Sequence, residues 1–169
     1  MSERVKQMVW NNFVLVFVIA AIIMGLVSVY VYDNEAAGSF LQGFLFFCVG
    51  CFGIGAFFQH WIRPSADRIA EGLGWPKGSP FQKEVAAADG AFGILGVICG
   101  FILPSNSVGF FTATTIGASF MYFMMGVGHV LDIVKTGNRS PLNAGVMVYY
   151  GLLLPVVMIV LLILYHAGT

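Results

Sequence analysis

Residues 90–131 read GAFGILGVICGFILPSNSVGFFTATTIGASFMYFMMGVGHVL, and this stretch contains no Asp, Glu, Lys or Arg. A membrane-crossing helix needs about 20 apolar residues, because the hydrocarbon core of a bilayer is about 30 Å thick and an α-helix rises about 1.5 Å per residue. The stretch is therefore too long for a single crossing. Pro104-Ser105-Asn106-Ser107 interrupts it near the middle, and we interpret these residues as a tight turn between two membrane helices.

The same length test, applied outward from this turn, predicts five membrane helices. Hydrophobic residues make up 59% of the chain and charged residues only 9%, whereas a soluble domain carries about 25% charged residues. The predicted fold class is therefore all-α, a polytopic integral membrane helical bundle with a single transmembrane domain over residues 1–169. The transmembrane helices are expected at about residues 10–32, 39–62, 80–103, 108–134 and 143–165.

The basic residues predict the orientation of this bundle, because short cytoplasmic loops carry an excess of Lys and Arg. In a five-helix arrangement every Lys and Arg falls on the same side of the membrane. We therefore expect the N-terminus in the cytoplasm and the C-terminus outside. The basic residues concerned are Arg4, Lys6, Arg63, Arg68, Lys77, Lys83, Lys135 and Arg139.

The connection between the second and third predicted helices has a helical pattern of its own at residues 64–73. Pro64 and Asp67 are typical of a first helical turn. The pattern predicts a short amphipathic helix in the cytoplasmic interface, anchored by Trp61 and Trp75. Its apolar residues recur at helical spacing and are Ala66, Ile69, Ala70 and Leu73.

Ionisable side chains inside membrane segments are candidate functional groups, because a central Asp costs about 2.5 to 3.5 kcal/mol to insert. Asp89 lies about 13 Å into the third predicted helix. His129 and Asp132 are three residues apart on the fourth helix and share a side of it. His60 and Glu84 belong to the same end of the bundle. We expect these five residues to form one polar pocket that faces the cytoplasm.

Carboxylates and imidazoles together suit a divalent metal ion such as iron, manganese or zinc, or a proton relay. The spacing does not make a metal motif, because Glu84 and Asp89 diverge by about 140° around a helix at 100° per residue. The sequence shows no phosphate loop, dinucleotide fingerprint or Ser-His-Asp arrangement, so no catalytic or cofactor-binding residue is predicted.

Two other interpretations of the polar residues remain open. In the first they are structural: Glu84 complements a positive helix end, His60 and Asp132 cap helices, and Arg63 or Arg139 pairs with a carboxylate. In the second, basic residues form a site for an anion or a lipid headgroup. The basic residues of that site are Arg63, Arg68, Lys77 and Lys83.

Two segments carry a resemblance to a known family. They are QHWIRPSADRIAEGLGWPKGSPFQKEVAAADGAFG at residues 59–93 and GHVLDIVKTGNRSPLNAG at residues 128–145. Together they resemble a family of small bacterial inner-membrane proteins catalogued as a domain of unknown function. The resemblance implies a multi-pass protein of the bacterial inner membrane and implies no activity.

The sequence leaves two classes of function. The first is a membrane protein whose polar pocket binds a metal ion or a proton-linked ligand for transport or membrane redox chemistry. The second is a structural or assembly subunit of a larger membrane complex or homo-oligomer, in which the polar cluster only fixes helix packing. The expected surroundings are the lipid bilayer, and the zero net charge gives no indication of nucleic acid.

Overall fold

The computed structural model describes residues 3–102 and 107–168, with side chains from residue 12 onward. Over these residues the chain is helical and forms no β-strand. Five stretches are long and apolar enough to cross a membrane, which confirms the predicted fold class. Most of the predicted turn at Pro104 to Ser107 lies outside the described residues. The five stretches are Asn12–Tyr32, Ala36–Trp61, Pro80–Ile102, Val108–Thr136 and Pro141–Gly168.

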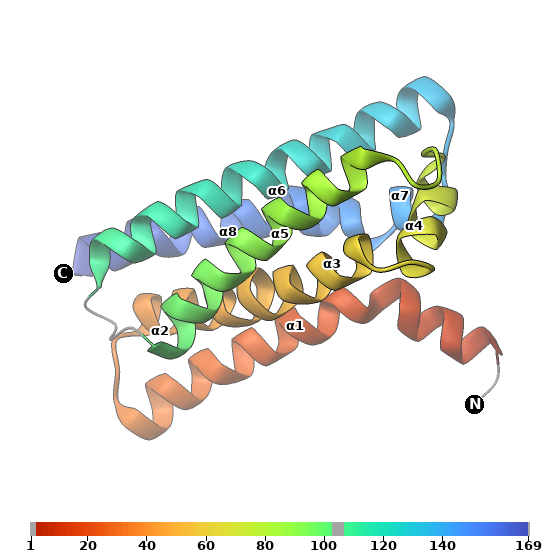
Figure 1. Ribbon diagram of the computed structural model, residues 1–169. Helices are drawn as coiled ribbons and strands as arrows, with labels where there is room; N and C mark the ends of the chain where they lie inside the picture. Colours follow the sequence, from red (N-terminus) through yellow and green to blue (C-terminus); the bar gives the residue numbers. More distant parts are fainter. Residues whose placement is uncertain (1–2, 103–106, 169) are drawn as a thin grey trace.

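Three of the five spans are built from more than one helical segment, and a short helix joins the second span to the third. The N-terminus and the C-terminus lie at opposite ends of the bundle (Figure 1). In chain order the elements are α1 (Glu3–Tyr32), α2 (Ala36–Phe44), the π-helical η1 (Leu45–Cys51), α3 (Phe52–Trp61), α4 (Ser65–Leu73), α5 (Pro80–Val97), the π-helical η2 (Ile98–Ile102), α6 (Val108–Thr136), α7 (Pro141–Ala144) and α8 (Val146–Gly168).

The spans pack in closely associated pairs, α1 with α2, α3 with α5, and α6 with α8. Lipid provides no hydrophobic drive between helices, so membrane helices associate where small residues let their backbones approach. Gly53 of α3 meets Gly93 of α5 in this way: a Cβ added to Gly53 would lie 2.9 Å from the Cα of Gly93. Gly126 of α6 and Gly151 of α8 form an equivalent contact, with a corresponding distance of 2.8 Å to the carbonyl carbon of Gly151.

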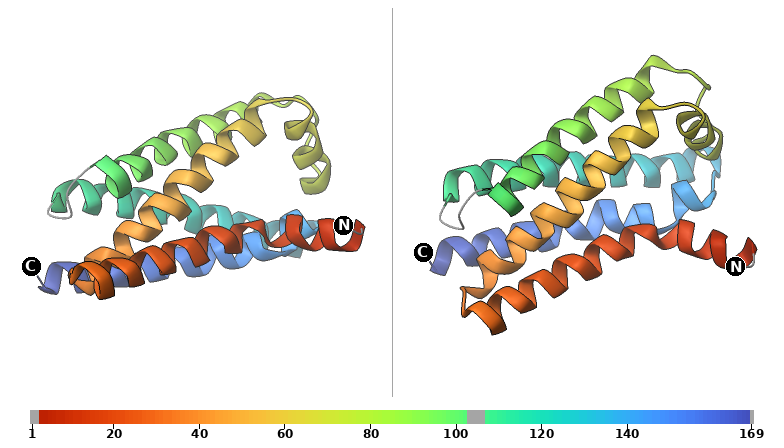
Figure 2. Two further views of the ribbon diagram at one scale, coloured as in Figure 1. Left: turned by 90° about the horizontal axis from the view of Figure 1, so that it is seen from below. Right: turned by 60° about the horizontal axis from the view of Figure 1, so that its bottom comes forward.

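Helix α4 caps one end of the bundle, the end that also carries α7 and the N-terminus (Figures 1 and 2). The expected apolar face of this helix is buried against the protein, so it is not available to lipid. Gln82 Nε2 donates a 2.8 Å hydrogen bond to the carbonyl of Ala66, and Ser140 Oγ donates to the carbonyl of Gly72. The short helix expected at residues 64–73 is therefore present, and protein contacts hold it at both ends.

The described basic residues gather at this same capped end. Lys83 lies over the ring of Trp61, 5.4 Å from its centroid, and Lys77 forms a 3.2 Å ion pair with Glu71. Arg63 precedes α4, and Arg68 belongs to it. Lys135 lies in the last turn of α6, and Arg139 lies in the loop after that helix. The opposite end of the described chain carries none of its Lys or Arg residues.

Candidate functional site

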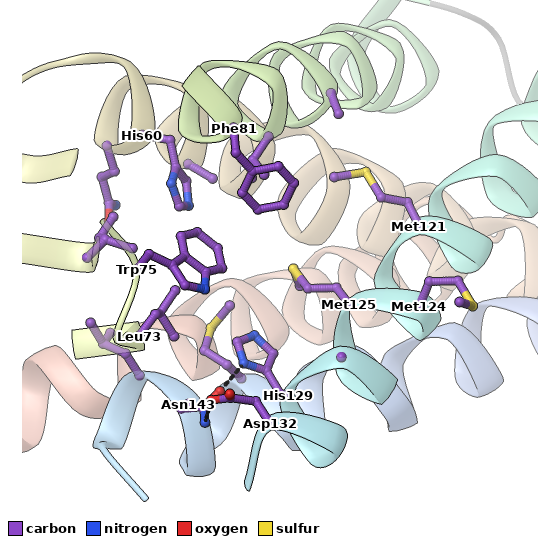
Figure 3. A pocket seen from close by; sticks show the side chains of 18 of the residues that line it. His60, Leu73, Trp75, Phe81, Met121, Met124, Met125, His129, Asp132 and Asn143 are labelled. Atoms are coloured by element: carbon purple, nitrogen blue, oxygen red, sulfur yellow. Dashed lines mark hydrogen bonds between the residues drawn. The ribbon is translucent and has the colours of Figure 1, made fainter. Parts of the chain in front are cut away.

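A cavity of about 450 Å³ lies in the bundle beneath the cap formed by α4 and α7. Pockets for small molecules typically measure about 300 to 1,000 Å³, so this volume suits a small organic ligand. Most of the lining is apolar, and the close-up in Figure 3 shows aromatic and methionine side chains around one space. These apolar residues include Phe13, Phe52, Trp75, Phe81, Met121, Met124, Met125 and Met147.

Three polar side chains at one side of the cavity form a hydrogen-bonded chain, here called the His129 relay (Figure 3). Asn143 is 1% exposed and lies in the middle of it. Its Oδ1 is 2.7 Å from His129 Nδ1, and its Nδ2 donates to Asp132 Oδ2 at 2.6 Å and to the carbonyl of Asn138 at 2.8 Å. The relay thus joins α6, the loop after it, and α7.

The bonds of Asn143 fix the chemistry of His129. A side-chain amide has two N–H donors, and here both are directed at oxygen acceptors. The amide oxygen is therefore the atom that faces the imidazole, and His129 must donate from Nδ1. In the neutral ring the other nitrogen, Nε2, is then a hydrogen-bond acceptor. His129 lines the cavity, so its ring offers this acceptor to a bound molecule.

A second imidazole, that of His60 on α3, points into the same space from the other side of Trp75 (Figure 3). The ring centroids of His60 and Trp75 are 6.4 Å apart. His60 Nδ1 is buried and has no hydrogen-bond partner within the described part of the chain. A buried polar atom without a partner costs about 1 to 3 kcal/mol, a cost that a hydrogen bond from a molecule in the cavity would remove.

The structure brings together three of the five predicted site residues and separates the other two. His60, His129 and Asp132 line the cavity, whereas Glu84 is exposed on the outer side of α5. Asp89 is 4% exposed and does not belong to the lining, although its neighbour Ala88 does. Among the described residues, no three side chains of His, Cys, Asp or Glu lie close enough together to hold a metal ion.

The comparison with protein families covers nearly the whole chain. The model of a family of unknown function, DUF6790, matches residues 11–169. The chain belongs to this family. The match confirms the resemblance drawn from residues 59–145 and extends it over all five spans. No curated protein and no solved structure matches the chain.

The charges around the cavity in this DUF6790 protein do not match those of the anion site considered above. Among the residues whose side chains the structure describes, no Lys or Arg belongs to the cavity lining, whereas Asp132 does. Arg68 and Lys77 are exposed on the outer surface, where Lys77 pairs with Glu71. The cavity therefore favours neutral or cationic molecules over anions, and its aromatic rings reinforce that preference.

Several residues that build the DUF6790 cavity were not singled out from the sequence. Asn143 enters the sequence prediction only as the first residue of the fifth helix, and the methionines have no predicted role. One signal could have pointed to Asn143: it follows Ser140-Pro141, a pattern typical of a helix start, at the membrane boundary where a polar amide must find partners. The methionine side chains give no comparable signal, because they occur throughout apolar helices.

Proposed function

We propose that this DUF6790 protein binds a small, largely apolar molecule that is neutral or cationic and whose polar end donates a hydrogen bond to His129 Nε2. The observation that carries the proposal is the His129 relay, which fixes the ring tautomer beside a cavity of about 450 Å³. A few well-placed polar groups in an otherwise apolar pocket are typical of ligand sites. His60 and Asp132 supply the other polar contacts, opposite the apolar lining.

Binding in this site requires the neutral imidazole of His129, because only that form offers Nε2 as a hydrogen-bond acceptor. A proton on Nε2 removes the acceptor that the ligand requires, and it also repels a cationic ligand. The site therefore holds either the proton or the cation, and this competition is what an exchanger of a ligand for a proton requires.

We further propose that the cavity faces the cytoplasm and that the membrane is the bacterial inner membrane. The described basic residues gather at the capped end, and cytoplasmic ends carry the excess of Lys and Arg. A Lys77→Cys variant should react with a membrane-impermeant maleimide only in inside-out vesicles, because Lys77 is exposed at that end. The unchanged protein, whose cysteines lie within the spans, is the control for background labelling. Labelling in right-side-out vesicles would overturn the orientation.

The ligand chemistry is tested with three naphthalene derivatives of one ring system and different charge: 2-naphthylmethylamine, 2-naphthylmethanol and 2-naphthoate. Calorimetry on the purified protein should show binding of the amine and the alcohol and none of the carboxylate. His129→Ala should weaken binding of the amine about tenfold, since one lost hydrogen bond is worth about 1.4 kcal/mol. Raising the proton concentration should weaken binding of the amine in the unchanged protein.

His166→Ala provides the matched control, because His166 is exposed at the far end of α8. It should bind all three probes as the unchanged protein does. Equal binding of amine and carboxylate, or equal losses in the two histidine variants, would contradict the proposal.

A structural or assembly role is the second candidate, and the buried Asn143 amide favours it. Its three hydrogen bonds join α6 to α7, which is what a purely architectural cluster would do. In that case His129→Ala should lower thermal stability or subunit assembly, while none of the three naphthalene probes binds the unchanged protein. Calorimetry and size-exclusion chromatography on the same preparations separate the two functions.

A further inference from the structure

Helix α6 carries a stripe of hydroxyl side chains along its inner face, beyond the ligand cavity. Thr112, Thr115, Ser119 and Tyr122 recur at intervals of three and four residues, which places them on one side of the helix. His129 lies on the same line, seven residues beyond Tyr122 and within the cavity lining. This hydroxyl stripe therefore leads from the cavity toward the opposite end of the span.

Two members of the hydroxyl stripe are buried without a partner. Thr115 is 0% exposed and Ser119 is 5% exposed, yet neither hydroxyl has a hydrogen-bond partner within the described part of the chain. Such hydroxyls in membrane helices usually bond to the carbonyl four residues earlier, as Thr112 does to Val108 at 2.7 Å. Unpaired buried hydroxyls are rare in native proteins, and a bound water is one way in which such a group is satisfied.

The spacing of the stripe fits single water molecules between successive hydroxyls. Thr115 and Ser119 are four residues apart, which corresponds to about 6 Å along the helix axis. This separation is too long for a direct hydrogen bond. Two hydrogen bonds of about 2.8 Å that meet at the tetrahedral angle of one water span about 4.6 Å, and side chains at i and i+4 begin about 5 to 6 Å apart at their Cβ atoms, so one water reaches both hydroxyls.

Titratable groups lie at both ends of the stripe. At the cavity end, the hydroxyls of Tyr122 and Tyr150 both donate to the carbonyl of Cys48, the Tyr122 bond measuring 3.2 Å. Asp89 is close enough to both tyrosines for electrostatic interaction and directly follows Ala88, a residue of the cavity lining. The carboxyl of Asp89 is therefore near the tyrosine pair, at the cavity end of the hydroxyl stripe.

At the opposite end, Thr112 Oγ1 lies 2.9 Å from Nε2 of His166, and the histidine is exposed near the C-terminal end of α8. An imidazole at this position can exchange protons with water outside the bundle. Along α6 the order from the cavity outward is therefore His129, Tyr122, Ser119, Thr115 and Thr112, and His166 of α8 lies beside Thr112.

We infer that the hydroxyl stripe of α6, with the water that Thr115 and Ser119 hold, conducts protons between the ligand cavity and the opposite end of the bundle. A proton added at His166 moves along the chain that the hydroxyls and the bridging water form, as each oxygen accepts one proton and releases another, and the proton that leaves the chain protonates Asp89. No bond other than O–H and N–H bonds changes, and the transmembrane proton gradient drives the movement. The inference goes beyond ligand binding and needs no ligand.

Purified protein in liposomes loaded with the pH dye pyranine tests this inference. A potassium gradient with valinomycin imposes a membrane potential, and the unchanged protein should move protons faster than empty liposomes. Thr115→Val, which keeps the shape and removes the hydroxyl, should lower the flux about tenfold. Ser119→Ala should have an effect of similar size, and Thr115→Ser, which restores a hydroxyl, should conduct like the unchanged protein.

A tyrosine pair supplies the matched control. Tyr150→Phe removes a buried hydroxyl next to the stripe, whereas Tyr149→Phe removes an exposed hydroxyl on the lipid side of the same helix. Only Tyr150→Phe should lower the flux. Circular dichroism of each preparation identifies variants that fail to fold. No flux above that of empty liposomes, or equal flux in Thr115→Val and Thr115→Ser, would overturn the inference, while the naphthalene binding experiment would remain unaffected.

Discussion

Gly96→Ala is expected to destabilise the protein by at least about 3 kcal/mol, the upper part of the range for overpacked cores. A Cβ at this position would lie 2.5 Å from the carbonyl oxygen of Leu45 and closer still to the backbone nitrogen of Gly50. Both groups are backbone atoms of η1, so no side-chain rotation can relieve the clash. The third span would have to move away from the second, and the paired backbone contact of Gly53 with Gly93 would open with it.

Thermal unfolding in detergent, followed by circular dichroism and size-exclusion chromatography, measures this effect. Gly55→Ala is the matched control, because it changes a glycine of the same helix pair with no atom within 4 Å of the added Cβ. That control should shift stability by no more than about 1 kcal/mol, the helix-propensity difference between the two residues. Equal stability of Gly96→Ala and Gly55→Ala would show that the two spans do not approach as described.

Asn143→Leu is expected to cost about 3 kcal/mol and to abolish binding of 2-naphthylmethylamine. The leucine fills a similar volume but leaves His129 Nδ1, Asp132 Oδ2 and the Asn138 carbonyl without their partner, at about 1 to 3 kcal/mol for each group that water cannot reach. Loss of the relay also frees the imidazole to rotate, so Nε2 no longer faces the cavity in a fixed tautomer.

Calorimetry and thermal unfolding on the same sample separate the two effects of Asn143→Leu. Asn34→Leu is the control, because Asn34 is exposed at the opposite end of the bundle. Its side-chain amide donates one hydrogen bond there, to the hydroxyl of Ser28. It should bind the amine normally and unfold at nearly the unchanged temperature. Unaltered amine binding by Asn143→Leu would mean that the relay does not orient His129.

The sequence predicted the five spans well because length and hydropathy add up along the chain. Each stretch between charged residues either reaches about 20 apolar residues or does not, and no tertiary information enters this test. The helical spacing of apolar residues, a local pattern, likewise predicted a helix at residues 64–73, observed as Ser65–Leu73. Its environment could not be predicted in this way, because an amphipathic face looks the same whether it meets lipid or another helix.

The candidate site was predicted less completely, for a geometric reason. Which side of a helix faces a pocket depends on its rotation relative to its neighbours, and a single sequence does not contain that angle. The divergence of about 140° between Glu84 and Asp89 did indicate that one pocket would not take both. In the structure Glu84 is exposed and Asp89 is buried. His129 and Asp132 share the cavity because three residues of spacing on one helix is a local relation.

The π-helical stretch η1 has a consequence for everything that follows it on the second span. In a regular α-helix the N–H of Phe52 would bond to Cys48, but here it bonds to the carbonyls of Phe47 and Val49, and two tyrosine hydroxyls bond to the carbonyl of Cys48. Each residue that such a segment inserts turns the remaining helix by about 100°. The faces of α3 are thereby rotated about the helix axis relative to those of α2. This rotation directs Gly53 toward the third span and His60 toward the ligand cavity.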